Sequence, residues 1–270
     1  MNVFLYVIAA LFGLIIGSFL NVLILRKSLR KSIGGRSHCR GCKKTLSPVE
    51  LVPIVSFLIQ KGRCRSCGIA LLWQYPLVEL ATAILFVISF ILVNPSFFDV
   101  YSWLILFGVW IGVAVGVVII VFDLRYTIIP DYAVIALLIL GVIASIMKSG
   151  NIQNFPFSNN SLIPTWLAAF IISGFFAALW LFSKGRWMGL GDAKLILSTS
   201  VLLGFPASLV AFLFSFWLGA LVSFLLILCG KKSLTSKLPF GPFIVFASVL
   251  SYFLIPHMNC AEYAFFCLFT

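Results

Sequence analysis

The stretch Met188-Gly-Leu-Gly-Asp-Ala-Lys194 places a carboxylate where an apolar run begins. A charged side chain at membrane depth costs about 3 kcal/mol or more, so acids found there usually face protein or water and have a function. Gly189 and Gly191 have no Cβ atoms and would let a second backbone approach Asp192, as a site acting on a peptide bond requires. The same residues also fit a helix-capping acid after a glycine turn, and both interpretations stay open.

The composition indicates what kind of protein surrounds this stretch. Of 270 residues, 62% are hydrophobic and only 10% are charged, whereas about a quarter of the residues of a soluble domain are charged. The sequence therefore predicts an all-α polytopic membrane protein. Eight apolar runs approach the ~20 residues that cross a bilayer; they are Val3–Leu25, Pro76–Val93, Tyr101–Phe122, Tyr132–Met147, Leu162–Phe182, Ala193–Gly204, Ala207–Cys229 and Phe240–Pro256.

The sixth and seventh runs could form one long helix, but Gly204-Phe205-Pro206 between them favours a turn. The basic residues support two separate helices, and hence eight crossings. With the N-terminus outside, 18 of the 19 Lys and Arg residues fall on inside loops and only Lys148 falls outside. Eleven of the inside residues lie between Arg26 and Arg65, and the others are Arg125, Lys184, Arg186, Lys194, Lys231, Lys232 and Lys237.

The net charge of +12 then reflects membrane orientation and contact with anionic lipid, and it does not indicate nucleic-acid binding. The first run lacks a basic segment before it and a convincing cleavage site, so we expect a retained helix. Within that run, Gly13 and Gly17 have the spacing of close helix packing, and Asn21 is expected to face protein.

The polar segment 26–74 is predicted to be a small zinc-binding domain. It contains Cys39-Arg-Gly-Cys42 and, after 21 residues, Cys64-Arg-Ser-Cys67. Two such pairs present four thiolates to one tetrahedral Zn²⁺, and the basic residues around them favour deprotonated thiols. Two disulfides are the alternative, which the reducing side of the membrane disfavours. His38 adjoins the first pair, but four cysteines already fill the site.

Two features beside the cysteines have a less specific pattern. The residues Leu51–Leu58 are too apolar for a solvated loop, and we expect them to pack against the bilayer surface or the helices. Glu79 lies near the inside end of the second run. It either caps the first turn of that helix or lines the site, with the structural role favoured.

A second acid, Asp123, ends the third run at the same inside face as Asp192. Asp131 follows a proline at the start of the fourth run, where an acid suits the helix dipole, so it is the weaker catalytic candidate. Pro239-Phe-Gly-Pro242 makes a non-helical entry to the last run, and such backbone must be covered by protein or water, which suggests that it borders the same cavity. Two aspartates without a Ser, His or Cys partner in either motif indicate aspartic-protease chemistry, in which the pair shares one proton.

Together these motifs resemble those of the type IV prepilin peptidases, a family of polytopic membrane aspartic proteases. The resemblance covers nearly the whole chain and departs mildly at Arg40, where family members often have Pro. It runs through Gly17-Ser-Phe-Leu-Asn21, the four-cysteine domain with Gly62-Arg-Cys-Arg-Ser-Cys67, Tyr75-Pro-Leu-Val-Glu-Leu80, Asp123 seven residues before Pro130, Gly189-Leu-Gly-Asp192 with Lys194, and Pro239-Phe-Gly-Pro242.

The resemblance implies cleavage of the basic leader of prepilins and pseudopilins, after a glycine, at the cytoplasmic face of the bacterial inner membrane. Asp123 and Asp192 would be the catalytic pair, supported by Gly189, Gly191 and Lys194. Members with the cysteine domain also N-methylate the new N-terminus with S-adenosylmethionine, although the sequence shows no recognisable methyl-donor pocket. The implied domains are a first transmembrane helix over 1–25, the zinc-binding domain over 26–74 and the membrane peptidase over 75–270.

Two other classes of function stay open. An intramembrane aspartic protease of the presenilin type shares Gly-x-Gly-Asp but would not need a cysteine domain. An ion-coupled transporter could use the acids as proton sites, and it would be expected to have inverted-repeat symmetry between its halves, which the sequence does not show.

Overall fold

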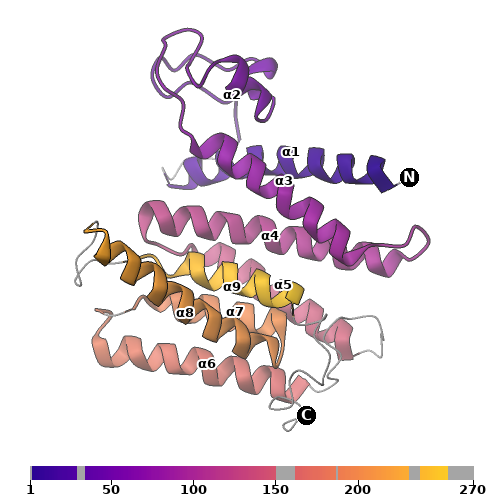
Figure 1. Ribbon diagram of the computed structural model, residues 1–270, viewed down its shortest axis with the longest axis vertical. Helices are drawn as coiled ribbons and strands as arrows, with labels where there is room; N and C mark the ends of the chain where they lie inside the picture. Colours follow the sequence, from indigo (N-terminus) through magenta and orange to yellow (C-terminus); the bar gives the residue numbers. More distant parts are fainter. Residues whose placement is uncertain (1, 29–33, 150–161, 187, 231–237, 255–270) are drawn as a thin grey trace. The chain divides into compact units, whose positions relative to one another are not determined.

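The computed structural model describes residues 2–28, 34–149, 162–186, 188–230 and 238–254. All long regular elements in these ranges are helices (Figure 1), which confirms the all-α prediction. Their bounds are α1 Asn2–Ser28, η1 Pro48–Leu51 (a 3₁₀ turn), α2 Val55–Ile59, α3 Gln74–Val93, α4 Val100–Tyr126, α5 Asp131–Ser149, α6 Leu162–Ser183, α7 Leu190–Leu203, α8 Ala207–Leu228 and α9 Gly241–Leu254.

The eight predicted apolar runs correspond to α1 and to α3 through α9. Five helical stretches among the described residues are long and apolar enough to cross a membrane: Val3–Arg26, Gln74–Val93, Val100–Tyr126, Thr165–Ser183 and Ala207–Leu228. Helix α7 has 14 residues, or about 21 Å, which is shorter than the ~30 Å hydrocarbon core. Eight crossings therefore stay a prediction. The predicted inside residues Lys231, Lys232 and Lys237 and the end of the last run at Pro256 lie outside the described residues.

The chain divides into two compact units, Met1–Val118 and Ile119–Thr270, with the division inside α4. In the first unit α1 and α3 pack antiparallel through the two glycines of the first apolar run. A Cβ on Gly13 would lie 2.6 Å from the Cα of Ala83, and one on Gly17 would lie 2.7 Å from the Cα of Glu79. The predicted packing through small residues is therefore confirmed, and it allows contacts that no larger residue would permit.

The same helix pair continues into a polar contact. Asn21 is buried and its Nδ2 donates to the backbone oxygen of Tyr75 at 3.1 Å, while Gln74 Nε2 donates to Asn21 Oδ1 at 3.2 Å. Asn21 thus faces protein, as expected from its position. Nearer the N-terminal end of α1, the ring of Phe86 on α3 stacks on Trp110 in the N-terminal half of α4, and the two ring centroids are 4.8 Å apart.

In the second unit, α5 and α7 run parallel and pack closely. Asp131 at the start of α5 forms an ion pair with Lys194 in the first turn of α7. Further along, a Cβ on Gly141 would lie 2.8 Å from the backbone nitrogen of Leu202. These contacts place the N-terminal ends of α5 and α7 at the same end of the unit.

Helix α8 runs antiparallel to α7 and α9, and the three helices pack against one another (Figure 1). Tyr252 near the end of α9 packs against a cluster that contains Leu203 and Ala207, whereas Gly219 in the second half of α8 lies against Phe240 at the start of α9. The reversal between α7 and α8 occurs at residues 204–206, so the predicted turn between two separate helices is confirmed. The N-terminal ends of α5, α7 and α9 consequently share one end of the unit.

Candidate active site and metal site

The first candidate acid, Asp123, lies one turn before the end of α4 and is buried, with 5% of its surface exposed. Its Oδ2 accepts a hydrogen bond from the backbone N–H of Gly241 at 2.8 Å. Gly241 is the first residue of α9, so the positive end of the α9 dipole faces the carboxylate. A Cβ on Gly241 would lie 2.7 Å from that oxygen, and only glycine can therefore make this contact without displacing the acid.

The second candidate acid, Asp192, lies in the first turn of α7 and is half-buried. Its Oδ2 accepts a hydrogen bond from the backbone N–H of Gly189 at 3.2 Å, which is the capping contact that one interpretation of the sequence expected. Asp192 also lies within electrostatic range of Asp123. The structure therefore places both acids at the same end of the second unit and gives Asp192 a capping role.

Ile129, in the link between α4 and α5, lies between the two acid motifs. A Cβ on Gly191 would be 3.2 Å from the Cβ of Ile129, and a Cβ on Gly241 would be 3.4 Å from its Cδ1. One isoleucine side chain thus covers the glycine next to Asp192 and the glycine that binds Asp123. Sequence reasoning did not identify Ile129 as part of the site.

Asp131 and Lys194 pair with each other at 2.9 Å, and both side chains are exposed. Exposed pairs of this kind contribute about 0–1 kcal/mol. Asp131 begins α5, which agrees with its predicted position at a helix N-terminus. Lys194 therefore contacts an acid on α5 and joins the first turns of α5 and α7.

The four cysteines of the first unit form a cluster. Their sulfur atoms all lie within 4.8 Å of one another, and the Sγ atoms of Cys39 and Cys67 are 3.7 Å apart. A tetrahedral site with Zn–S bonds of ~2.3 Å sets its sulfurs about 3.8 Å apart, whereas disulfide sulfurs lie ~2.05 Å apart. All four are free thiols, so the donor set and spacing fit a metal ion and not two disulfides.

Two similar backbone turns present these thiols. The N–H of Cys39 donates to the oxygen of Lys44, and the N–H of Cys64 donates to the oxygen of Ile69, each at 2.9 Å. Backbone hydrogen bonds from Cys67 first and then Ser66 lower the pKa of Cys64 to about 6. A lowered pKa favours the thiolate, which is the form that binds metal.

Glu79 joins the cysteine segment to the helices of the first unit. It is buried in the second turn of α3, and its Oε2 accepts a hydrogen bond from the backbone N–H of Ile54 at 2.8 Å. One interpretation of the sequence was that Glu79 caps the first turn of α3. The structure does not show this contact, because the partner of Glu79 lies 25 residues earlier in the chain. Its observed role is structural, and it fixes the start of α2, where Ile54 has a φ of 59°.

The fold and the site define a polytopic α-helical membrane protein with two carboxylates at one end of its second unit and a four-thiol cluster in its first. The chain belongs to the type IV leader peptidase family. Residues 110–224 match the model of that family, and residues 11–93 match the bacterial peptidase A24 N-terminal domain. The resemblance inferred from the motifs is therefore confirmed.

Relatives match along almost the whole chain. A prepilin leader peptidase/N-methyltransferase of Bacillus subtilis (strain 168) is 33% identical and covers 90% of this chain and 91% of its own. A protein of Legionella pneumophila with the same name is 26% identical over 93% and 91% of the two chains. A type 4 prepilin-like proteins leader peptide-processing enzyme of Escherichia coli O78:H11 is 29% identical over 92% and 93%. No solved structure matches the chain.

Proposed function

We propose that this chain cleaves the leader of type IV prepilins with the aspartate pair Asp123 and Asp192. The observation that carries the proposal is that both acids lie at one end of the second unit, within electrostatic range of each other, where Gly241 N–H holds the first acid and Gly189 N–H holds the second. The names of the relatives supply the substrate class, since they are called prepilin leader peptidases.

Two interacting carboxylates at close quarters hold one proton between them. The ionised member accepts a proton from water as the water oxygen bonds to the scissile carbonyl carbon. The protonated member donates its proton to the carbonyl oxygen, which gives a neutral tetrahedral intermediate. When the carbon–nitrogen bond breaks, the protonated acid donates its proton to the leaving nitrogen, and the ionised acid accepts a proton from one hydroxyl of the intermediate as the new carboxyl group forms. The pair therefore again holds one shared proton.

The two glycines before Asp192 support this chemistry. Gly189 holds the acid through its backbone N–H, and Gly191 lacks a Cβ, so that Ile129 can pack directly beside it. Lys194 supports the site indirectly, because its ion pair with Asp131 joins the first turns of two helices.

Cys39, Cys42, Cys64 and Cys67 would hold one structural Zn²⁺. A bound zinc would cross-link the two turns of a segment that has too small a core to order itself alone. In this proposal residues 26–74 form the zinc-binding domain, residues 1–25 the first membrane helix and residues 75–270 the peptidase. The double name of the relatives suggests a second activity, N-methylation of the new N-terminus with S-adenosylmethionine.

In the proposed topology the N-terminus lies outside, eight segments cross the inner membrane, and the acid pair and the zinc domain face the cytoplasm. Helix α2, between the two cysteine pairs, is expected to contact the bilayer surface. Its apolar side chains Val55, Leu58 and Ile59 are 49%, 67% and 58% exposed, and the hydrogen bond from Ile54 to Glu79 ties the start of this segment to α3. Lipid, rather than protein within this unit, is the expected partner of these side chains.

The test of the proposal is to incubate the purified protein in detergent with a prepilin, with and without S-adenosylmethionine, and to analyse the products by mass spectrometry. We expect loss of the leader in both reactions and addition of one methyl group only with the donor. An intact prepilin after incubation with folded protein would contradict the peptidase assignment. Cleaved but unmethylated product in both reactions would contradict the second activity alone.

A further inference from the structure

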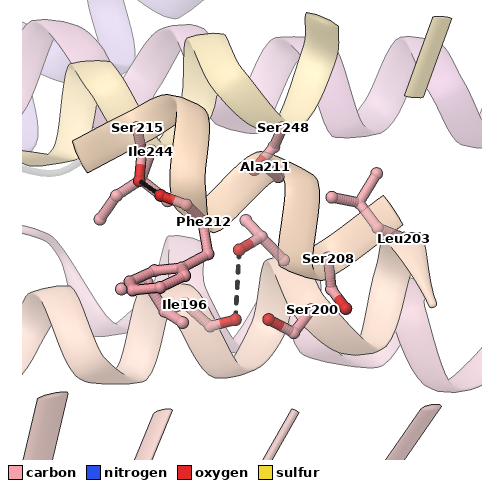
Figure 2. A pocket seen from close by; sticks show the side chains of 10 residues that line it. Ile196, Ser200, Leu203, Ser208, Ala211, Phe212, Ser215, Ile244 and Ser248 are labelled. Atoms are coloured by element: carbon pink, nitrogen blue, oxygen red, sulfur yellow. Dashed lines mark hydrogen bonds between the residues drawn. The ribbon is translucent and has the colours of Figure 1, made fainter. Parts of the chain in front are cut away.

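A small polar cavity lies between α7, α8 and α9 (Figure 2). Hydroxyl groups from all three helices line it, and most of the surrounding side chains are buried. The lining residues are Ile196, Thr199, Ser200, Leu203, Ser208, Ala211, Phe212, Ser215, Ile244 and Ser248. None of them is charged.

One of these hydroxyls has no hydrogen-bond partner among the described residues. Ser208 is 2% exposed, and its Oγ lacks any partner there. Thr199 on α7 differs in this respect, because its Oγ1 donates to the oxygen of Leu195 at 3.0 Å. That hydroxyl oxygen keeps its lone pairs for a further donor. The cavity therefore combines a free donor on α8 with a free acceptor on α7.

We infer that this cavity binds one ordered water molecule, which accepts a hydrogen bond from the hydroxyl of Ser208 and donates to hydroxyl oxygens of α7. The cavity leaves about 10 Å³ for the centre of a water-sized sphere. A buried site holds a water when this volume reaches roughly 10–15 Å³ and two to four polar groups surround it. Both conditions are met here, because the volume reaches this range and the hydroxyl groups of Ser208, Thr199 and Ser200 line the cavity.

The chemistry of the lining excludes a metal cation as the occupant. A buried positive charge requires a negative or fully coordinating shell, and it is unfavourable without one. The lining offers only hydroxyl groups and apolar side chains, with no carboxylate. A neutral molecule that both donates and accepts hydrogen bonds satisfies the same groups without that cost.

The position of the cavity gives the water a structural consequence. Ile196, Ser200 and Leu203 follow Asp192 on one face of α7, since they lie four, eight and eleven residues after it. Ile244 and Ser248 likewise follow Gly241 on α9. The water therefore joins α7, whose first turn holds Asp192, to α8, which packs against α9. This last point depends on the proposed function, whereas the water site itself does not.

The test compares the thermal unfolding of Ser208→Ala and Ser251→Ala in detergent. Ser251 also has a buried hydroxyl without a partner among the described residues, but it does not line the cavity. If water fills the cavity, Ser208→Ala removes one of its hydrogen-bond partners and lowers the Tm by about 2–4 °C, while Ser251→Ala leaves the Tm unchanged or raised. In a dry cavity Ser208→Ala removes an unsatisfied hydroxyl, so an unchanged or raised Tm would overturn the inference.

Two further measurements decide the matter, and the first of them needs no variant. An experimental density map that shows other buried waters should have a peak within hydrogen-bond distance of Ser208 Oγ, and no peak there would contradict the site. Replacing Na⁺ by choline in the buffer should leave the Tm unchanged. A Tm that rises with Na⁺ in the wild type and not in Ser208→Ala would show a cation in the cavity and overturn the assignment to water.

Discussion

At the scale of single residues, a backbone amide positions the buried acid. The N–H of Gly241 at the start of α9 donates a hydrogen bond to Asp123, and this 2.8 Å contact joins residues 118 positions apart. The absence of a Cβ on Gly241 permits this approach. Catalytic geometry in the proposed site therefore depends on a residue without a functional side chain.

Gly241→Ala is expected to lower kcat/KM for leader cleavage by about 10²-fold, because the new methyl group would displace the Asp123 carboxylate and a shift of about 1 Å has effects of that size. Cleavage kinetics and thermal unfolding should be measured together. Gly174→Ala in α6 is the matched control, since a Cβ there meets nothing within 4 Å. Wild-type kinetics in a folded Gly241→Ala variant would show that the amide contact is dispensable.

Ile129 is expected to restrict the size of the substrate residue beside the scissile bond, because it fills the space between Gly191 and Gly241. A prepilin with Ala in place of the glycine before the cleavage site should be cleaved about 10-fold faster by Ile129→Ala than by the wild type, which is the usual value of one methyl group in a pocket. Ile128→Ala is the control, since Ile128 is 62% exposed. Equal discrimination by wild type and Ile129→Ala would refute this role.

At the scale of elements, the helices could be predicted and several of their contacts could not. The length of an apolar run and the turn signal Gly204-Phe205-Pro206 are local features of the sequence. The helix ranges and the reversal between α7 and α8 could therefore be predicted from them. The contacts of Asp123 with Gly241 and of Glu79 with Ile54 are tertiary. No local sequence pattern predicts these two contacts. The glycine between Pro239 and Pro242 did indicate that the backbone at the start of α9 borders the site, but it did not indicate which residue it contacts.

The close packing of α1 on α3 should be sensitive to a single methyl group. Gly17→Ala is expected to lower the free energy of unfolding by about 1–3 kcal/mol, since its Cβ would lie 2.7 Å from the Cα of Glu79. Gly108→Ala in α4 is the control, because a Cβ there has open space, and it should be neutral or stabilising. Denaturant titration in detergent measures both; equal stabilities of the two variants would argue against this helix contact.

At the scale of the whole molecule, the proposed zinc and peptidase functions reside in different parts of the chain. Replacing Cys39, Cys42, Cys64 and Cys67 with Ser is expected to release about one Zn²⁺ per chain and to impair methylation more than cleavage, because membrane helices satisfy their own backbone hydrogen bonds without zinc. Bound metal and the two products should be quantified separately.

Cys229→Ser is the control for that experiment, because Cys229 is an exposed free thiol outside the cluster. It should retain both the metal and the two activities. An unchanged metal content in the four-serine variant would contradict the zinc site. Full methylation by a zinc-free protein would show that the cysteine segment is not needed for the transferase activity.

The most direct measurement is leader cleavage by the folded variants Asp123→Asn, Asp192→Asn and Asp131→Asn, followed by mass spectrometry of the prepilin. A pair that shares one proton needs both carboxylates, so each of the first two variants should lose cleavage while remaining inserted and folded. Asp131→Asn should keep substantial activity, because Asp131 begins α5 and pairs with Lys194 on the exposed surface. Normal processing of the leader by either Asp123→Asn or Asp192→Asn would contradict the aspartate-pair mechanism.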